Sequence, residues 1–427
     1  MPEERAGGRP DAQLLVFTEA YPYDAALEQP FLDPQLRFLS RAFSSVLVIP
    51  SRRGGARSEV PEGVLVDEGL ASLLEDRRSP PAVLAAAVGS GLMGSDLRRR
   101  PSLLLSVSAI RLLVGMTARA EITRQWFTNT LVRRRLDPSR SVAYTFWMDH
   151  TTLGVGLAKT KLPGLVLVSR ANGADLFLER HQPAYLPARE FAFAALDRLF
   201  AASEHARHYA ALHYPWFDRC EVAPLGVPDP GFLARPSSAR RFVLASCSAL
   251  VPVKRVDLIQ QAVRSLAQRR PDLEVVWHHF GDGPMSPMIE TAMRDSPANA
   301  TMHLHGRQPN AEVMRFYREQ PVDAFLNASA SEGGAPVAIV EAASCGIPII
   351  ATAVGGTPEI VSDRNGRLVS PDAGPDAIAD ALTDLIDDPE GAAAKRIESR
   401  RMWAVGYQAD VNSERFADRL LQLRADS

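Results

Sequence analysis

The sequence is poor in cysteine, in net charge and in long apolar runs. Its three cysteines, Cys220, Cys247 and Cys345, form no CxxC pair and show no metal-ligand spacing, so neither a disulfide framework nor a structural zinc site is indicated. The 427 residues include 48 basic and 50 acidic side chains, and this near balance gives no argument for a nucleic acid partner. We therefore expect a globular protein of a reducing, cytoplasmic compartment.

Apolar runs that could cross a bilayer are also missing. The longest candidate, residues 101–118, is interrupted by Arg111, and the ten uncharged residues before it are too few to span a membrane. The first 13 residues are polar and lack the apolar core of a secretory signal. Residues 97–135, however, carry nine arginines and one glutamate among many leucines. This basic, partly amphipathic pattern fits either a peripheral position on the inner, anionic face of a membrane or a solvated helical face.

Short apolar runs alternate with longer helical stretches along the chain. The first series of strand-like runs lies at residues 14–18, 46–50, 142–146, 165–169 and 199–203, and a second series follows residue 241. This alternation predicts parallel sheets covered by helices on both faces. The expected fold class is α/β, with two doubly wound, Rossmann-like domains and a ligand-binding cleft between them.

A stretch rich in proline, glycine and serine, residues 224–241, separates the two series and is typical of a linker. The apolar spacing from residue 376 onward is helical. The predicted organisation is a first domain at 1–225, a linker at 226–241, a second domain at 242–395 and a C-terminal helix at 396–427 that packs back toward the first domain.

The most informative stretch runs from residue 323 to residue 369. A strand leads into a loop rich in serine and glycine that opens a helix, with Pro336 suited to the first turn and Gly346 to the position past the end. Because the first N–H groups of a helix have no partner within it, such a loop is an anion site. The turn at 355–359 repeats the arrangement, with Thr357 as the expected N-cap and two glycines that let a ligand approach the backbone.

Two carboxylates, Glu332 and Glu341, lie beside these loops in the sequence. A buried carboxylate is costly unless it accepts hydrogen bonds, and sugar hydroxyls are suitable donors. The alternative is that Glu332 caps a loop and Glu341 faces solvent.

These residues resemble the donor-binding signature of a known family. The run SEGG…IVEAASCGIPIIATAVGGTPEIV is similar to that of retaining nucleotide-sugar glycosyltransferases of the GT-B fold, the large family four or group 1. Further similar segments lie at 248–255, 278–284, 303–313 and 365–371. In the N-terminal half, YPYDAALEQPFLDPQL and SRANGADLF resemble members that build bacterial surface polysaccharides.

The resemblance implies a role for each matching residue. Lys254 would contact the donor diphosphate, Arg255 would supply a second charge, and Glu341 would accept hydrogen bonds from the nucleotide ribose. Glu332 would lie near the transferred sugar, and Arg307 would lie in the segment that holds the base. The expected substrate-binding residues are Lys254, Arg255, Gly283, Arg307, Gly333, Gly334, Ala335 and Glu341, and the expected catalytic residues are Glu332, Lys254, Asn172 and His150. The structural alternatives are a solvent-exposed charge at a helix end for Lys254, a surface turn for Arg307 and a core histidine for His150.

Three features depart from the family pattern. Glu332 and Glu341 are one residue further apart than is common, so the loop between them is longer. Ala249 stands where many relatives have a basic residue, and Asn172 stands where many have a histidine near the sugar. Asparagine can hydrogen-bond a sugar hydroxyl but cannot hold a positive charge.

The implied reaction is transfer of a sugar from a UDP- or GDP-linked donor to a hydroxyl, with retention at the anomeric carbon. No carboxylate is evident for a covalent intermediate. We therefore expect Lys254 and the helix N-termini to stabilise the leaving diphosphate, which takes the acceptor proton. No cofactor and no metal ion are expected, because the sequence has no Asp-x-Asp pair after a strand and no histidine pair at metal spacing.

The acceptor should bind the first domain, at the loops 19–35, 144–150 and 169–175. The basic segment 97–135 suits a lipid-linked or polysaccharide-precursor acceptor, and a soluble acceptor stays open. Two other functions also stay open: a nucleotide-sugar 2-epimerase of the same fold and a non-catalytic nucleotide-sugar-binding partner subunit. A dehydrogenase is disfavoured, because no strand is followed by G-x-G-x-x-G with an acidic residue downstream.

Overall fold

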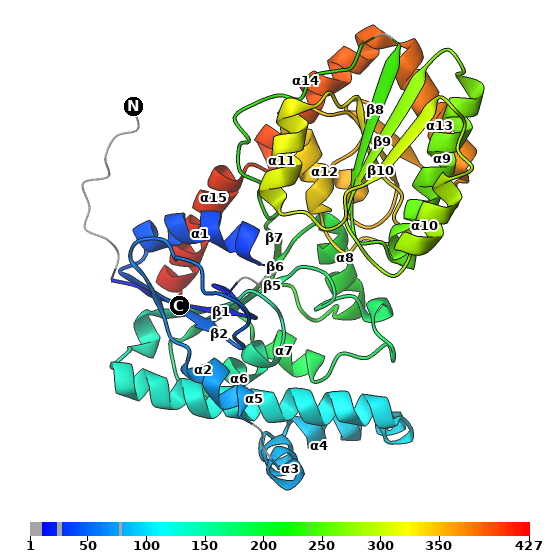
Figure 1. The fold of residues 1–427 in the computed structure, drawn as a ribbon. Coiled ribbons are helices and arrows are strands. Elements are labelled where there is room, and N and C mark those ends of the chain that lie inside the picture. Colours follow the sequence, from blue (N-terminus) through cyan, green and yellow to red (C-terminus); the bar gives the residue numbers. More distant parts are fainter. Residues whose placement is uncertain (1–10, 24–27, 77–78, 239) are drawn as a thin grey trace. The chain divides into compact units, whose positions relative to one another are not determined.

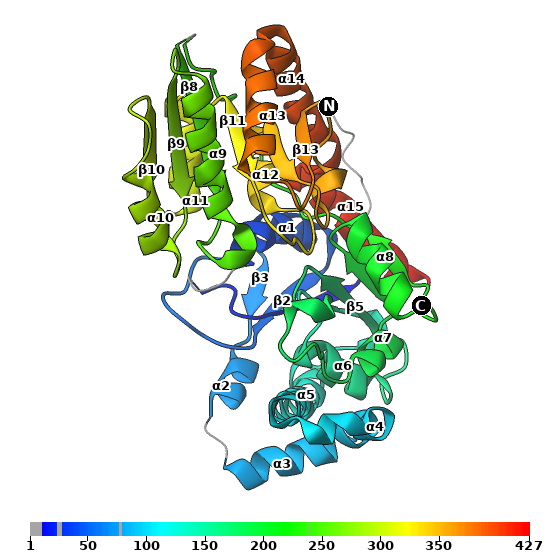
Figure 2. The same ribbon diagram turned by 90° about the vertical axis from the view of Figure 1, so that its right-hand side faces the viewer.

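The computed structural model describes residues 11–23, 28–76, 79–238 and 240–427 (Figure 1). The chain forms two compact units. The first contains the residues up to Ala223 together with Ala409–Ser427, and the second contains Pro224–Gln408. Each unit is built around one parallel β-sheet with helices on both of its faces (Figures 1 and 2).

The first sheet has seven parallel strands in the order β3-β2-β1-β4-β5-β6-β7. The strands are β1 (Gln13–Thr18), β2 (Ser45–Pro50), β3 (Val64–Val66), β4 (Ser141–Thr145), β5 (Val166–Ala171), β6 (Arg198–Ala201) and β7 (Cys220–Val222). The central strands are buried on both faces, which explains why their sequences are continuous apolar runs rather than alternating ones.

The described helices of the first unit are α1 (Gln29–Ala42), α2 (Gly69–Glu75), α3 (Pro80–Gly89), α4 (Leu92–Arg99), α5 (Val107–Arg134), α6 (His150–Lys159), α7 (Arg189–Ala195), α8 (Glu204–His213) and α15 (Ala409–Ala425). The long helix α5 is anchored to the sheet by Trp126 and Phe127, whose ring centroids lie 6.3 and 5.9 Å from that of Phe17 in β1. No helix in the described part of the chain, the 28-residue α5 included, combines the length and the apolarity needed to cross a membrane.

The second sheet has six parallel strands in the order β10-β9-β8-β11-β12-β13. They are β8 (Arg241–Cys247), β9 (Glu274–Phe280), β10 (Ala300–Leu304), β11 (Ala324–Asn327), β12 (Ile349–Thr352) and β13 (Gly366–Val369). The helices are α9 (Val256–Arg269), α10 (Ser286–Met293), α11 (Asn310–Glu319), α12 (Val337–Ser344), α13 (Pro375–Asp387) and α14 (Pro389–Gly406). Trp277 is fully buried in the core of this unit and donates from Nε1 to the hydroxyl of Ser246 at 2.9 Å.

Both sheets are doubly wound, as predicted, so the predicted α/β class with two Rossmann-like sheets is confirmed. In each sheet the strand order reverses beside the first strand, between β1 and β4 and between β8 and β11. Ligands of such sheets bind at this switch point, outside the carboxyl ends of the strands. The loops that follow these four strands are therefore where a site is expected.

The stretch predicted as a linker, residues 226–241, belongs to the second unit instead. The N–H groups of Val227 and Ala234 donate to the carbonyl oxygens of Tyr407 and Cys345, at 2.8 and 2.9 Å. The side chains of Val227 and Ala234 also lie in the apolar core of that unit. A segment rich in proline can thus be fixed by its remaining backbone donors and a few apolar side chains.

The C-terminal stretch 396–427, predicted as one returning helix, is divided between the units. Helix α14 ends at Gly406 and belongs to the second unit, whereas α15 begins at Ala409 and belongs to the first. Trp403 fixes the end of α14 in the second unit, because its Nε1 donates to the carbonyl oxygen of Val227 at 3.0 Å.

Candidate functional site

The loops at the switch point of the second sheet bring a lysine and a glutamate together. Lys254 ends the short 3-10 helix η4 (Pro252–Lys254) after β8, and Glu332 lies in the loop after β11. The Nζ atom of Lys254 lies 2.5 Å from Oε1 of Glu332. The side-chain exposure is 8% for Glu332 and 22% for Lys254. The structure thus holds an ammonium and a carboxylate together at the place where doubly wound sheets bind ligands.

The turn after β12 shapes the loop that carries Glu332. Gly355 has a positive φ of 54°, and a Cβ atom built on it would lie 1.9 Å from the carbonyl oxygen of Glu332. The close approach predicted for a ligand at this glycine is therefore made by the protein's own backbone. Thr357 does not cap the turn, contrary to the prediction, because Gly356 holds that position. The Thr357 hydroxyl is buried and has no partner among the described residues.

Arg255 adopts a left-handed conformation, with a φ of 45°. Its Nε and Nη1 atoms donate to the carbonyl oxygens of Ala328 and Pro371, each at 2.7 Å. These bonds fasten the loops that follow β8, β11 and β13, and they offset the roughly 1 to 2 kcal/mol that a left-handed L-residue costs. The remaining nitrogen, Nη2, is buried without a partner among the described residues. The predicted second charge thus keeps one donor unengaged.

The helix after this loop, α12, begins without a capping side chain. Pro336 occupies the N-cap, one position before the predicted first turn, and no side chain caps the helix start. The N–H groups of Val337 and Ala338, which follow Pro336 at the start of the helix, have no partner among the described residues, as an anion site requires. At the other end Gly346 has a φ of 71°, in agreement with its predicted place past the helix.

Glu341 lies in the second turn of α12 and is largely removed from water. Burial raises its pKa to about 7, although a hydrogen bond from Asn310 acts in the opposite direction. That bond runs from Nδ2 of Asn310 to Oε1 of Glu341, at 2.6 Å. A desolvated carboxylate with one side-chain donor among the described residues retains acceptor capacity for ligand hydroxyls. Sequence reasoning missed Asn310, although it lies in the family-like segment 303–313.

Gly283 and Arg307 follow β9 and β10 and stand apart from the lysine–glutamate pair. A Cβ atom on Gly283 would lie 2.5 Å from the carbonyl oxygen of Leu250, so this glycine lets the loops after β8 and β9 pack together. Arg307 is exposed and makes no hydrogen bond or ion pair within the described part of the chain. Since β10 lies two strands from β8, Arg307 follows a strand about 10 Å away from the pair.

His150 lies in the first unit, at the start of α6, and both of its ring nitrogens face α5. Nε2 lies 3.1 Å from Nη2 of Arg119, and Nδ1 lies 3.3 Å from the hydroxyl of Thr123. Burial lowers the pKa of His150 to about 4, so the ring is neutral near pH 7. Because arginine can only donate, Nε2 accepts and Nδ1–H donates. This leaves His150 no unengaged ring nitrogen, and Arg119 is the residue that sequence reasoning missed.

Asn172 follows β5 and organises the turn that ends at Asp175. Its Nδ2 donates to the carbonyl oxygen of Phe146 at 2.9 Å, and its backbone N–H donates to Oδ1 of Asp175 at 2.9 Å. Asp175 also accepts from the N–H groups of Met148 and Gly173, at 3.2 and 2.8 Å. The side-chain oxygen of Asn172 is buried and has no partner among the described residues. One acceptor is thus left for a ligand hydroxyl.

The loops expected to hold an acceptor are described in part. Residues 24–27 of the predicted loop 19–35 lie outside the described residues. In its described part, Glu28 is fully buried, and its Oε1 accepts from the N–H groups of Ala20 and Tyr21 at 2.9 and 3.2 Å. Within the described ranges, no group of three or more His, Cys, Asp or Glu side chains is placed to hold a metal ion. The metal-free reaction stays a prediction.

Two doubly wound sheets in tandem are the architecture of the GT-B fold, and solved structures share this architecture with the chain. The galactosyltransferase WaaB of the lipopolysaccharide outer core, in its apo form, has a TM-score of 0.66 at 15% identity, over 96% of this chain and 99% of that one. Anabaena HepE in complex with UDP has a TM-score of 0.63 at 15% identity, over 96% of this chain and 100% of that one. These likenesses establish the fold.

A family model matches part of the second unit. Residues 234–403 match the family model of the glycosyl transferases, group 1. The fold is thus that of the GT-B proteins, and the resemblance to group 1 seen in the sequence is confirmed over residues 234–403, which are less than half of the chain.

Two curated relatives are similar over part of the chain. The GDP-mannose-dependent alpha-(1-6)-phosphatidylinositol monomannoside mannosyltransferase of Mycolicibacterium smegmatis is 30% identical over 202 residues, which are 45% of this chain and 52% of the relative. The D-inositol 3-phosphate glycosyltransferase of Streptomyces coelicolor is 33% identical over 265 residues, 51% of this chain and 55% of the relative. The chain thus spans about half the length of the curated relatives it matches.

Proposed function

We propose that the protein is a glycosyltransferase that moves a sugar from a nucleoside-diphosphate donor to an acceptor hydroxyl. The observation that carries this proposal is the switch point of the second sheet, where Lys254 and Glu332 are 2.5 Å apart beside an uncapped helix start. These are groups for a diphosphate and for sugar hydroxyls. All of these groups lie within residues 234–403, which match the family model of the glycosyl transferases, group 1.

In this proposal each part of the nucleotide-sugar donor is bound by a different group of the protein. The ammonium of Lys254 and the first N–H groups of α12 bind the diphosphate, because both present positive charge to phosphate oxygens. Glu341 accepts hydrogen bonds from the ribose, and Glu332 from the transferred sugar. A relative named for its use of GDP-mannose and a solved neighbour bound to UDP support a GDP- or UDP-linked donor.

We infer that the anomeric configuration is retained and that no metal ion takes part. Glu332, the carboxylate beside the expected sugar position, already pairs with Lys254, which argues against its use as a covalent nucleophile. The leaving diphosphate, stabilised by Lys254 and by the helix start, then takes the acceptor proton on the same face.

The proposed acceptor is a hydroxyl of a lipid-linked or polysaccharide-precursor molecule, bound at the carboxyl ends of β4 and β5 in the first unit. The unpartnered oxygen of Asn172 supports this placement, because it offers an acceptor for a hydroxyl. His150, with both ring nitrogens engaged, acts as a positioning residue for the turn at the start of α6. Curated relatives named for phosphatidylinositol monomannoside and for amylovoran biosynthesis agree with such acceptors.

A thermal-shift panel of UDP, GDP, ADP and dTDP with their common sugar conjugates, without added metal, tests the donor site. A ligand at about 100 times its dissociation constant stabilises the folded state by about 2.7 kcal/mol. One nucleotide class should raise the melting temperature, and Glu341→Gln should reduce the stabilisation to about 0.4 to 1.4 kcal/mol, because it is expected to weaken binding about 10- to 100-fold. The matched control, Glu312→Gln on α11, should keep it, because Glu312 pairs only with Arg315 in the described residues.

Turnover is then measured with the stabilising donor and a lipid-linked acceptor. A glycosylated acceptor with retained configuration supports the proposal, whereas conversion of the donor to its 2-epimer without an acceptor contradicts it. If no nucleotide shifts the transition, the donor site is not functional and the proposal fails.

A further inference from the structure

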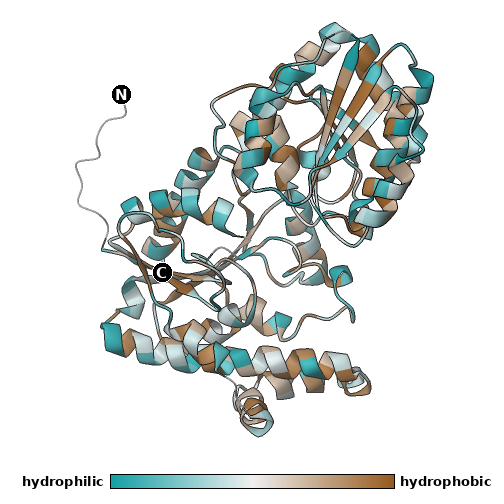
Figure 3. Ribbon diagram, in the orientation of Figure 1, coloured by the Kyte–Doolittle hydropathy of each residue, from teal (hydrophilic) through white to brown (hydrophobic). Residues whose placement is uncertain are grey.

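Helix α3 is apolar on every side and yet exposed. Its sequence, PPAVLAAAVG, contains no polar or charged side chain. Ala87 is its one buried residue, while Leu84 and Val88 are 49% and 57% exposed. A helix that is hydrophobic all round is normally buried in a core or in lipid. Figures 1 and 2 show α3 on the side of α5 that faces away from the sheet, and Figure 3 shows its hydrophobic character.

The exposed apolar surface continues into the start of α5. The 3-10 helix η1 (Pro101–Leu105) and the first turns of α5 expose Leu104, Leu105, Val107 and Leu112, by 66, 90, 69 and 44%. Six of the sixteen exposed large hydrophobic side chains among the described residues therefore lie between positions 84 and 112. Scattered exposed leucines are ordinary, but these six lie on α3, η1 and α5, of which α5 contacts both others, and such a group marks an interaction surface.

This surface is held rigidly in place by contacts behind it. Leu103, Leu113 and Tyr185 form a small buried cluster below the exposed leucines. Asp96 in the middle of α4 accepts from the hydroxyl of Tyr185 at 2.6 Å and from the N–H of Ala188 at 2.7 Å. These contacts hold in place the backbone that carries the exposed leucines.

The charge around these leucines is positive. Arg98 and Arg111 make no hydrogen bond or ion pair within the described residues. Between positions 80 and 118 the one acidic residue is Asp96, whose carboxylate is engaged as described above. Unpaired cations beside exposed leucines are complementary to an anionic, apolar partner.

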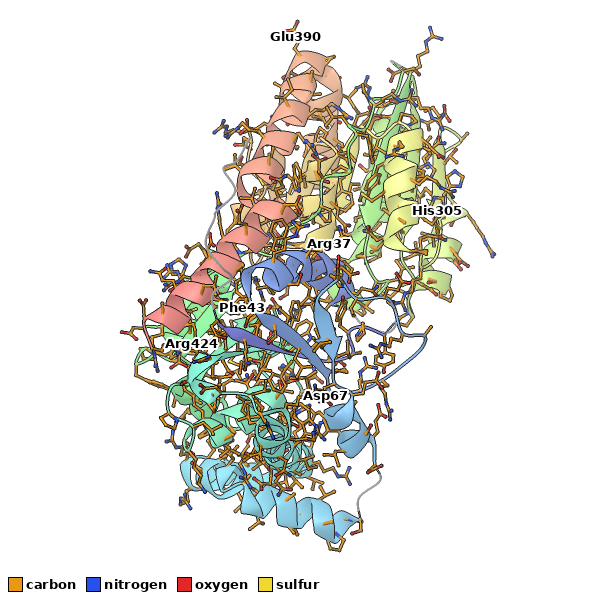
Figure 4. All side chains as sticks on the ribbon, turned by 90° about the vertical axis from the view of Figure 1, so that its left-hand side faces the viewer. Arg37, Phe43, Asp67, His305, Glu390 and Arg424 are labelled. Atoms are coloured by element: carbon orange, nitrogen blue, oxygen red, sulfur yellow. The ribbon has the colours of Figure 1, made fainter. Side chains whose placement is uncertain are left out.

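The arginines further along the segment 97–135 do not belong to this surface. Arg124 donates to Glu121 at 2.8 Å, and Arg134 donates at 2.8 Å to Asp67, which is labelled in Figure 4. Arg119 faces His150. Of the later arginines in this segment, Arg135 is exposed without a side-chain partner among the described residues, but it lies past the far end of α5.

We propose that residues 80–112, the apolar–basic surface, dock the protein onto an anionic lipid bilayer. The ten residues of α3 make a helix of about 15 Å, half the thickness of the hydrocarbon core, so α3 lies in the interface and does not cross it. The exposed leucines enter the headgroup region, and Arg98 and Arg111 contact lipid phosphates. The surface deepens the proposed function, because it brings the protein to a lipid-linked acceptor, but its test needs neither donor nor acceptor.

The test is co-sedimentation with vesicles of phosphatidylcholine alone and of an equimolar mixture of phosphatidylcholine and phosphatidylglycerol. The full chain should sediment with the anionic vesicles and should stay in the supernatant with the neutral ones. Raising the salt from 0.1 to 1 M should release it, because the screening length falls from about 10 Å to about 3 Å. The double variant Arg98→Gln, Arg111→Gln should bind about 30-fold more weakly, since each cation near an anionic surface contributes about 1 kcal/mol.

A second double variant, Leu104→Ser with Leu105→Ser, should lower vesicle binding at least about tenfold through lost apolar burial. Both leucines are exposed, so the thermal transition of this variant should equal that of the wild type. The matched controls are Leu212→Ser, at an exposed leucine on α8 that is 77% accessible, and Arg264→Gln, at an exposed arginine on α9. Neither control should change binding.

Three outcomes would overturn the proposal. The wild type would fail to bind anionic vesicles, or the control variants would lose as much binding as the two double variants. In the third, light scattering would show that the serine variant converts a dimer to a monomer while vesicle binding is absent, which would make the surface a contact between two copies. Nucleotide binding in the thermal-shift panel is a separate readout, so failure here is distinguishable from failure of the proposed function.

Discussion

The two sheets share a strand order but differ in the side chains that lie at their switch points. In the second unit, the groups there keep bonding capacity: Glu341 has one side-chain donor among the described residues, and Arg255 has an unpartnered nitrogen. In the first unit, both ring nitrogens of His150 and the amide nitrogen of Asn172 are occupied by the unit itself. The same topology therefore carries charged groups in both units, but in the first unit those of Glu28, Asp175 and Arg119 are largely bonded within the unit itself.

Because the two sheets have the same strand order, the difference in their ligand-binding groups comes from the loops and not from the fold. Charged groups at a switch point cost folding free energy unless a ligand completes their hydrogen bonds. The second unit bears this cost at Lys254, Glu332 and Glu341, whereas the first unit offsets it with backbone N–H groups that donate to the buried carboxylates of Glu28 and Asp175. Substitutions that remove the charge, the loop shape or the desolvation should therefore act differently in the two units.

The largest effect is expected from Lys254→Ala, which should lower turnover about a hundredfold or more, as removal of one group that stabilises developing charge typically does. The melting temperature should also fall, because Glu332 is left as a buried carboxylate without its cation. Adding Glu332→Gln should restore stability but not turnover. Lys395→Ala, which removes a lysine that bonds the carbonyl oxygen of Asp363, is the matched control. Near-normal turnover in Lys254→Ala would show that the charged switch point of the second unit does not take part in the reaction.

Gly355→Ala should come next, with a loss of roughly 2 to 4 kcal/mol in the free energy of unfolding and weaker nucleotide binding. The added Cβ would lie 1.9 Å from the carbonyl oxygen of Glu332, so the loop must move. Thermal unfolding with and without nucleotide measures both effects. Gly374→Ala should change little, since no atom lies within 4 Å of its Cβ position. Equal behaviour of the two variants would show that the loop is not shaped by this contact.

Glu341→Gln should weaken nucleotide binding about 10- to 100-fold, the loss expected for a hydrogen bond to a charged group. Without nucleotide, the raised pKa of about 7 means that the folded state loses stability as the pH rises from the ordinary value of 4.5 to about 7, and this loss is complete above pH 7. Glu341→Gln should therefore melt higher than the wild type near pH 8 in the absence of ligand. Isothermal titration and thermal unfolding together test this reversal, and a variant that loses stability and affinity alike would contradict it.

His150→Gln should give the smallest effect. The pKa of His150 is lowered to about 4, so its neutral form stabilises the folded state above pH 6.5 and this stability is lost as the pH falls toward 4. Urea unfolding should show that the variant loses less stability than the wild type on acidification, by about 1 kcal/mol near pH 5.5. Nucleotide affinity should not change. A loss of nucleotide binding in His150→Gln would contradict the expectation that nucleotide binding depends on the second unit.

Most of the fold could be predicted from the sequence. Strands buried on both faces must be continuous apolar runs, so their positions are visible without a structure. The loop at Glu332 was also predictable, because glycine and proline mark the ends of α12 through backbone geometry alone. Gly346, with its positive φ, is such a residue.

The remainder depends on contacts between distant residues. Helical periodicity shows which face of residues 396–427 is apolar but not which unit covers it, so the division between α14 and α15 was not predictable. Arg119 precedes His150 by 31 positions, and no local pattern links them. The role of Gly355 depends on the backbone of Glu332, which reaches it through the packing of two loops.

The assignment of α15 to the first unit has a consequence for synthesis. Phe416 on this helix packs edge-on against Tyr144 and Phe200, with ring centroids 5.1 and 4.9 Å apart, and Arg419 pairs with Glu221. These contacts cannot form until the ribosome has translated the second unit, which is continuous in sequence. The first unit is therefore translated first but completed last. Until α15 has been translated, the nascent chain must shield the apolar surface that this helix covers in the folded protein.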